Sequence, residues 1–200
     1  DGKLGQAGSF NGTSSFIDVG HIYTSSVSVA FWTKLNTLGD NWFVGKRDNG
    51  LNKYWQIQNY AGSGENLSVD LSDKEGNWVS AINANFNIQA NRWYHFCFTT
   101  TGKEGSKAYL YVDGLEMSSS VLSGDINSGD NQPVIVGARA WDPYGNSHVD
   151  GLIDDVRIYD HALSLKEVQE LAKAKVLHYN FNHFQEPTEN LFPEALRQMS

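Results

Sequence analysis

Cysteine, proline and long apolar runs are scarce in this chain, and each scarcity excludes a class of protein. Cys97 is the one cysteine among 200 residues, so an internal disulfide and a cysteine-based zinc cluster are both excluded. Four prolines leave no proline-rich disordered region. No apolar run is long enough to span a bilayer, so we expect no membrane insertion.

Positive charge is also in short supply. Fifteen Lys and Arg residues stand against 23 Asp and Glu residues, which gives a formal net charge of -8. Because a phosphate backbone would be repelled, we expect no nucleic-acid partner. The chain begins at Asp1 without a methionine or a signal peptide, and we expect it to be a piece of a larger protein.

Aromatic residues and glycines, in contrast, are abundant. Six Trp, nine Tyr and ten Phe suit packed sheets and sugar-stacking surfaces, and 19 Gly indicate many turns. Short strand-like runs recur between turn residues, at 26–34, 41–46, 54–58, 66–71, 91–100, 107–114, 133–138 and 148–160. This pattern is typical of an all-β antiparallel sandwich or jelly roll.

One helix is expected, over residues 164–173. Ser164 can cap it, and Glu167 three residues later completes a capping box. We therefore predict a two-sheet antiparallel jelly roll over 1–174 with one short C-terminal helix. Residues 175–200 then either complete its sheet or open a further domain.

Four phrases follow one another along the chain: "GKLGQAGSFNGTSSFIDVG", "NRWYHFCFTTTG", "KAYLYVDGLEM" and "GLIDDVRIYDHALSLKEVQELA". In this order and at this spacing they resemble the laminin G-like, concanavalin A-like jelly rolls, including the pentraxin-related modules. The resemblance covers roughly residues 2–173. It implies a convex and a concave sheet face, frequent calcium binding, and a role in binding glycans or proteins, although some members are enzymes.

Asp154 is a candidate calcium ligand. Strand alternation places it on one face with Val156 and Ile158, which we expect to point into the core. An inward carboxylate needs a partner, because an unpaired buried charge is very costly. Calcium would satisfy it. Backbone N–H groups, or a pairing with Arg47 or Arg139, would do so as well, and these alternatives stay open.

The resemblance to pentraxins implies a second calcium site at a loop rim. The phrases "GKRDNG" and "VGARAWDPYGNSHVDG" resemble the pentraxin loops that supply the ligands, which carries this role over to Asp48, Asn49 and Asp142. The pentraxin pattern has a Glu at the position of Ala140, so one ligand is lost here. An Asp-Asn-Gly run is also a common hairpin turn.

Three aromatic residues in turn-rich stretches are candidate carbohydrate contacts. Trp141 and Tyr144 lie in "RAWDPYGN", and Trp78 lies in "KEGNWVSA". Loops at one end of a sandwich are where binding sites collect, and an exposed Trp can stack on a sugar ring. The alternative for Trp141 is that it folds back over a sheet edge. His95 and Cys97 share a strand face, but without a third orienting group they make a poor nucleophile pair.

No catalytic signature is present. The glucanases of the resembled family use Glu-x-Asp-x-x-Glu on one strand, because a retaining mechanism needs two close carboxylates, and no such triplet occurs. We therefore predict no enzyme but a lectin-like, calcium-supported, carbohydrate-binding adhesion module of a larger extracellular, cell-surface or virion protein. Its expected partner is a carbohydrate or a glycoprotein.

The alternative is a structural or assembly domain of a surface, virion or phage tail protein that contacts neighbouring domains. The strand-like run 176–181 bears on this alternative. We expect it to fill a vacant position beside the strands that contain 8–12 and 150–158. It would do so in its own chain or in a neighbour, and the second case makes a homo-oligomer.

Overall fold

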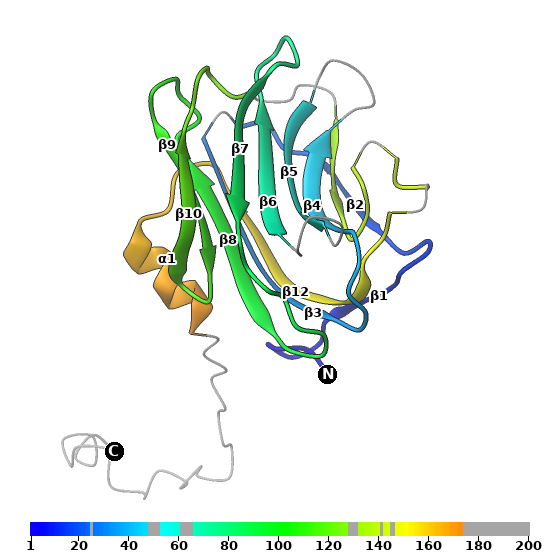
Figure 1. Ribbon diagram of the computed structural model, residues 1–200. Coiled ribbons are helices and arrows are strands. Elements are labelled where there is room, and N and C mark those ends of the chain that lie inside the picture. The colour runs from blue at the N-terminus through cyan, green and yellow to red at the C-terminus, as the bar shows by residue number, and fades with distance from the viewer. Residues whose placement is uncertain are drawn as a thin grey trace, which may run out of the picture.

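Two six-stranded antiparallel sheets lie face to face, as the sequence predicts (Figure 1). The structure is a computed structural model that describes residues 1–24, 26–47, 53–60, 66–127, 132–140, 142–144 and 147–173. The first sheet has the order β1 (Gly8–Asn11), β12 (Asp150–Tyr159), β3 (Val27–Leu35), β8 (Tyr94–Thr100), β9 (Lys107–Val112) and β10 (Leu115–Val121). The second has the order β2 (Ile17–His21), β11 (Pro133–Val136), β4 (Asn41–Arg47), β5 (Lys53–Tyr60), β6 (Asn66–Ser72) and β7 (Trp78–Ala84).

The core fills the space between the two sheets. In β3, Val27, Val29 and Phe31 alternate with outward residues and are fully buried. Phe31 of the first sheet packs against Phe43 of the second, with ring centroids 5.6 Å apart, and edge-on against Phe96 at 5.7 Å. Burial of each such side chain contributes about 1.5–3 kcal/mol, so alternation in the central strands holds the sheets together.

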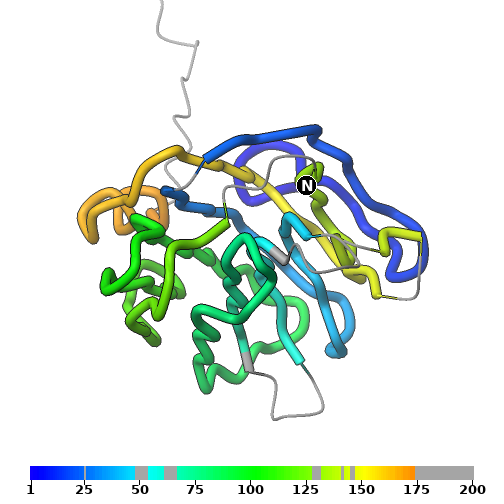
Figure 2. Tube along the Cα trace, turned by 90° about the horizontal axis from the view of Figure 1, so that it is seen from above, coloured from blue at the N-terminus to red at the C-terminus, as the bar shows by residue number. Residues whose placement is uncertain are grey.

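The single described helix, α1 (Leu165–Ala172), lies on the outer face of the first sheet. Its predicted capping box is confirmed: the Ser164 side chain accepts a hydrogen bond from Glu167 N–H, and the Glu167 carboxylate accepts one from Ser164 N–H. Val168 is fully buried in a cluster with Ala30 and Cys97. The helix therefore covers one part of the first sheet. It lies at the other end of the molecule from β1 and β2 (Figures 1 and 2).

Three strands were missed by the sequence prediction, namely β2, β7 and β10. All three are edge strands. Most side chains of β2 and β10 are exposed, so their apolar alternation is weak; β10, for example, reads LEMSSSV. β7 buries four of its seven residues, and this reason does not apply to it. The neighbouring Asp-Gly turn was predicted, and Asp113 and Gly114 have φ values of 51° and 79°, as the tight β9–β10 hairpin requires.

The expected alternation along β12 was wrong at its centre. The pairing with β3 shifts between Asp154 and Arg157, and Asp155 has a φ of 49°, which marks a β-bulge. Ile153 belongs to the core cluster, so Asp154 points to the outer face of the first sheet instead of inward. After the bulge Ile158 again packs against the core.

Two predictions about the C-terminal part of the chain stay untested. The predicted strand 176–181 and the boundary after residue 174 lie outside the described residues. Within the described residues, no helix has the length and apolar character needed to cross a membrane.

Candidate functional site

The outer face of the second sheet, which points away from the first, carries aromatic, amide and charged side chains. Strand pairing puts Trp42 of β4 opposite Gln58 of β5, and Gln58 opposite Ser68 of β6. Paired residues share a face, so these three side chains stand together. Their neighbours Ile57 and Val69 belong to the core between the sheets.

Contacts join five residues of this outer face into one unit. The Gln58 amide donates from Nε2 to Tyr60 Oη at 2.8 Å and to Asp70 Oδ2 at 2.7 Å. Trp42 and Tyr60 meet edge to face, with ring centroids 5.8 Å apart. The Arg139 guanidinium lies over the Trp42 ring, 4.6 Å from its centroid. We call these residues, Trp42, Gln58, Tyr60, Asp70 and Arg139, the outer-face cluster.

Charges of both signs surround the phenol of this cluster. Burial raises the pKa of Tyr60 and Asp70 raises it further, whereas Arg47 and Arg139 lower it. The phenol is therefore neutral at physiological pH and can both donate and accept a hydrogen bond. An acid, guanidinium groups and a phenol so close together suit recognition of a ligand with many hydroxyl groups.

Buried polar atoms on this face lack partners. Among the described residues, Gln58 Oε1, Ser68 Oγ and Ser72 Oγ are buried and make no hydrogen bond. A buried polar atom without a partner costs about 1–3 kcal/mol. These atoms are shielded from solvent, so a ligand at the surface would not reach them, and enclosed water would provide the missing hydrogen bonds.

The predicted ligand residues flank this cluster and do not join it. Trp78 is 46% exposed at the start of β7, with the Arg47 guanidinium 5.1 Å from its ring centroid. Tyr144 is 87% exposed and packs edge-on against Phe16, just before β2. Because β2 and β7 are opposite edges of one sheet, five strand spacings or about 24 Å separate them. One sugar ring cannot contact both. Trp141 lies outside the described residues.

Sequence reasoning missed the outer-face cluster, although a signal was present. In "YWQIQNY" and "NLSVDLS" polar residues alternate with apolar ones. Such alternation normally indicates a solvent-exposed face. Gln56 and Gln58, however, are fully buried, and sequence periodicity cannot distinguish an exposed polar face from a buried one.

Asp154 binds the N-terminal segment through a hydrogen bond. Its Oδ2 accepts a hydrogen bond from Leu4 N–H at 2.7 Å, and its Oδ1 accepts one from Asp155 N–H at 2.8 Å. Backbone N–H groups are therefore bonded to this carboxylate, whereas Arg47 lies in β4 and Arg139 lies in the loop after β11 of the second sheet. Each oxygen accepts one backbone hydrogen bond and the residue is 7% exposed, and calcium binding by Asp154 stays a prediction.

The rim calcium stays a prediction. Asp48 and Asn49 lie outside the described residues. Asp142 is exposed, and its N–H donates to the Arg139 carbonyl at 3.1 Å. Ala140, at the position of the missing ligand, is buried in a small apolar cluster. No group of three or more His, Cys, Asp or Glu within the described ranges is placed to hold a metal.

The pair His95 and Cys97 is unsuited to nucleophilic chemistry. Burial lowers the pKa of His95 to about 4 and raises the pKa of Cys97 to about 12. Neither a thiolate nor an imidazolium therefore forms near neutral pH. His95 packs instead against Trp32, with ring centroids 5.2 Å apart.

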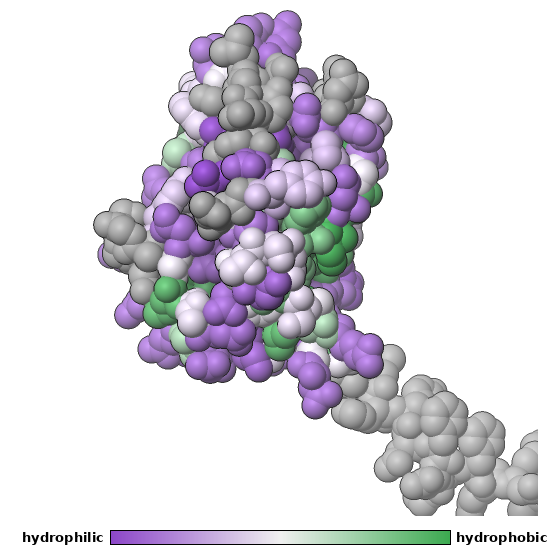
Figure 3. Space-filling model, turned by 90° about the vertical axis from the view of Figure 1, so that its right-hand side faces the viewer, coloured by the Kyte–Doolittle hydropathy of each residue, from purple (hydrophilic) through white to green (hydrophobic). Residues whose placement is uncertain are grey.

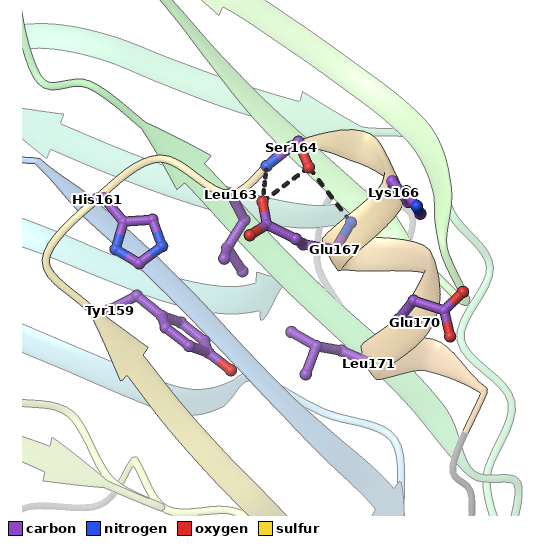
Figure 4. Close-up of a pocket in the computed structure, with 8 residues that line it drawn as sticks. All are labelled: Tyr159, His161, Leu163, Ser164, Lys166, Glu167, Glu170 and Leu171. Carbon is purple, nitrogen blue, oxygen red and sulfur yellow. Dashed lines mark hydrogen bonds between the residues drawn. The ribbon is translucent and has the colours of Figure 1, made fainter.

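A hollow of about 710 Å³ lies between the end of β12 and α1 (Figure 4). Tyr159, Leu163 and Leu171 give it an apolar lining. Its one Ser–Glu contact, Ser164 with Glu167, is the helix capping box, and these hydrogen bonds lower the pKa of Glu167. A carboxylate of lowered pKa is a poor general base, so we assign no chemistry to this hollow.

Comparison with protein-family models finds one family that matches most of the chain. The family model described as "Concanavalin A-like lectin/glucanases superfamily" matches residues 9–169. None of the curated proteins is a significant match to the chain.

Three solved structures illustrate the shared fold. The heptameric SAP-like pentraxin from Limulus polyphemus has a TM-score of 0.66 at 17% identity, covering 82% of this chain and 80% of its own. Domain 4 of AbnA, an extracellular arabinanase from Geobacillus stearothermophilus solved with arabinotriose, has a TM-score of 0.64 at 25% identity, covering 86% and 79%. The CBM40 of the Ruminococcus gnavus IT-sialidase, bound to α2,3 sialyllactose, has a TM-score of 0.65 at 11% identity, covering 84% and 96%.

Proposed function

The chain belongs to the concanavalin A-like lectin/glucanases superfamily, and on this premise we propose that it is a non-catalytic carbohydrate-binding domain. Its ligand contacts lie on the outer face of the second sheet. The observation that carries the proposal is the outer-face cluster, in which a phenol, a carboxylate and a guanidinium, all partly exposed, stand over the buried Trp42 and Gln58.

The similar structures support the class of ligand. The arabinanase domain was solved with arabinotriose and the sialidase module with sialyllactose, and both share this fold. Binding domains of toxins occur among the similar structures as well. A binding role without catalysis also agrees with the pKa values of His95 and Cys97, which leave that pair inert near neutral pH.

The geometry assigns different tasks to the members of the cluster. Tyr60, Asp70 and Arg139 are partly exposed and would meet the sugar hydroxyls directly. Trp42 and Gln58 are buried beneath them and hold them in place. Trp78 and Tyr144, at the two edges of the sheet, would stack on more distant rings of a longer glycan. Few charge-assisted bonds imply a Kd from micromolar to millimolar, or about -8 to -4 kcal/mol.

Two finer features belong to the same proposal. Calcium at Asp48, Asn49 and Asp142 would organise the loops beside the sugar, and the exposed Asp142 supports this. Its affinity is expected to be modest, because Ala140 stands where the pentraxin pattern has a Glu. An extracellular, cell-surface or virion location would bring the domain to its glycans.

A glycan array probed with the 200-residue chain, with calcium and with chelator, tests the function. Calorimetric titration of the best glycan against Asp70→Asn and Arg139→Ala then tests the site. Each variant should weaken binding at least about 10-fold, which equals 1.4 kcal/mol. Asp125→Asn is the matched control, because that carboxylate pairs with Lys103 on the exposed surface of the first-sheet side.

The possible outcomes separate the site from the function. Loss of binding in Tyr144→Ala with full binding in Asp70→Asn would move the site to the predicted loop and leave the function intact. If no glycan binds, the carbohydrate proposal is wrong. The assembly-domain alternative would then gain weight.

A further inference from the structure

A second hollow, of about 350 Å³, opens on the outer face of the first sheet, between β9 and the start of α1. Strand β9 contributes Lys107, Tyr109 and Tyr111 to its lining, β10 contributes Glu116, and the segment before the helix contributes Leu163. In Figure 1, β9, β10 and α1 lie together at one end of the molecule. Figure 3 shows the opposite end, which carries β1 and β2 and has a mostly hydrophilic surface. The hollow is therefore separate from that end, and it lies on the other sheet from the outer-face cluster.

Tyr109 and Tyr111 form an aromatic wall of this hollow. They alternate along β9 with residues of the core, so both rings stand on the outer face of the sheet. The two rings are nearly parallel, at 28°, and their centroids are 6.1 Å apart. Tyr111 is 4% exposed in a cluster with Val168 of α1, whereas Tyr109 packs against this cluster and stays partly exposed. The helix thus holds one ring in place and leaves the other accessible to the apolar face of a sugar.

Charges of opposite sign stand at the two ends of the aromatic wall. Glu116 lies opposite Tyr111 in the β9–β10 pairing, and Lys107 precedes Tyr111 by four residues, or about 13 Å along the strand. Within the described part of the chain, neither charged side chain makes an ion pair or a hydrogen bond. Burial, followed by the Glu116 carboxylate, raises the pKa of Tyr111 to about 12, so this phenol is neutral at physiological pH. The carboxylate and the ammonium are therefore both free to bond a ligand.

The chemistry of the hollow fits a neutral ligand with many hydroxyl groups. A carboxylate only accepts hydrogen bonds, an ammonium only donates them and a phenol does both, and a hydroxyl group can bond to all three. The net charge of -8 opposes an anionic ligand. Small-molecule sites measure about 300–1,000 Å³, and this hollow lies near the lower limit, which restricts the ligand to a short oligosaccharide.

We propose that this hollow is a second carbohydrate site, which binds a short neutral oligosaccharide. The class of ligand rests on the proposed function, whereas the site uses another sheet and other residues. One sugar ring lies against Tyr109, Glu116 accepts hydrogen bonds from its hydroxyl groups, and Lys107 donates hydrogen bonds to the next ring. Because the two sites lie on the outer faces of opposite sheets, one domain can bind two glycan chains at once. Two sites raise the avidity for glycans that are clustered.

NMR titration of the 200-residue chain tests the proposal, with arabinotriose, cellotriose and lactose as neutral probes and sialyllactose as the acidic probe. A neutral probe should shift the amide resonances of residues 107–116. Glu116→Gln should weaken this binding at least about 10-fold, because a charge-assisted hydrogen bond is lost, and Tyr109→Ala should weaken it at least as much. Glu116 is exposed, so its variant keeps the packing of the hollow. Leu115→Ala is the matched control, since Leu115 is paired with the core residue Val112 and lies on the other face of β10.

Asp70→Asn separates this site from the outer-face cluster. The variant should lose the shifts around the cluster and keep those of residues 107–116. Wild type should cross-link beads coated with the neutral probe, whereas Asp70→Asn and Glu116→Gln should each fail to do so. If no neutral probe shifts residues 107–116 while the outer-face cluster responds, the second site is wrong and the proposed function stands. If neither site responds to any probe, both proposals are wrong. Tighter binding of sialyllactose than of lactose at this hollow also overturns the proposal, because the ligand would then be anionic.

Discussion

The outer faces of the two sheets differ in how the chain treats their polar groups. On the first sheet, α1 and the N-terminal segment cover the face, and the buried Ser28 is well bonded. Its hydroxyl donates to the His161 carbonyl at 2.7 Å and accepts from Leu163 N–H at 2.9 Å. On the second sheet, no described helix covers the face, and the equally buried Ser68 has no partner among the described residues.

The two faces differ in degree, because Trp32 Nε1 and His95 Nδ1 on the first face are also buried without a partner among the described residues. Asp154 illustrates the first face, because its carboxylate accepts two backbone hydrogen bonds within its own chain. Gln58 illustrates the second, since one end of its amide is bonded and Oε1 is not. A face whose polar groups are bonded contributes stability, whereas the partly exposed phenol, carboxylate and guanidinium of the second face are suited to a ligand.

The largest expected effect concerns Asp154 on the closed face. Asp154→Ala leaves the partly buried N–H groups of Leu4 and Asp155 without partners, so the free energy of unfolding should fall by about 2–4 kcal/mol. Urea denaturation measures this. Asp155→Asn is the control and should cost about 1 kcal/mol or less, because the ion pair with Arg157 is partly exposed and Asn tolerates the φ of 49° as Asp does. Equal losses in the two variants would contradict the fastening role of Asp154.

A pH effect of nearly this size should come from His95 on the same face. Its pKa is lowered by burial from 6.5 to about 4, so folding favours the neutral ring. This contribution is complete above pH 6.5, and about 3 kcal/mol of it should be lost as the pH falls to 4. His95→Gln should flatten the stability curve between these pH values in urea titrations. An unchanged curve would show that His95 titrates normally.

The matched pair Ser28→Ala and Ser68→Ala tests the comparison most directly. Ser28→Ala should lower the free energy of unfolding by about 2 kcal/mol, because Leu163 N–H and the His161 carbonyl lose their partner. Ser68→Ala removes a hydroxyl without a partner, so stability should stay within about 0.5 kcal/mol. Thermal melts and titration of the best glycan are the measurements. A larger loss in Ser68→Ala would mean that the second face is closed too.

The smallest expected effect is that of calcium on the rim loops. At a calcium concentration equal to the Kd, stability should rise by about 0.4 kcal/mol. Asp142→Ala should abolish this gain, while Asp154→Ala should keep it, since that carboxylate is occupied by backbone N–H groups. Differential scanning fluorimetry with calcium and with chelator would detect the shift. Identical curves for wild type would argue against the rim site.

Local patterns in the sequence determined much of the fold. The alternation in β3, the Asp-Gly turn at 113–114 and the capping box at Ser164 each depend on residues close in sequence, and all three agree with the structure. Edge strands such as β2 and β10 were missed, because a strand that packs on one side carries a weak apolar pattern. The bulge at Asp155 was missed as well, since it depends on pairing with a distant strand.

Only the tertiary structure decided where the polar groups meet. Gln58, Asp70 and Arg139 lie far apart in sequence, and pairing between strands of the second sheet brings them to one face. The sequence by itself determined that an acid stands in the β12 strand, and tertiary structure gave it the Leu4 amide as a partner. Periodicity reports which side of a strand is polar, but whether that side is covered, bonded or open depends on contacts between distant segments, which periodicity does not contain.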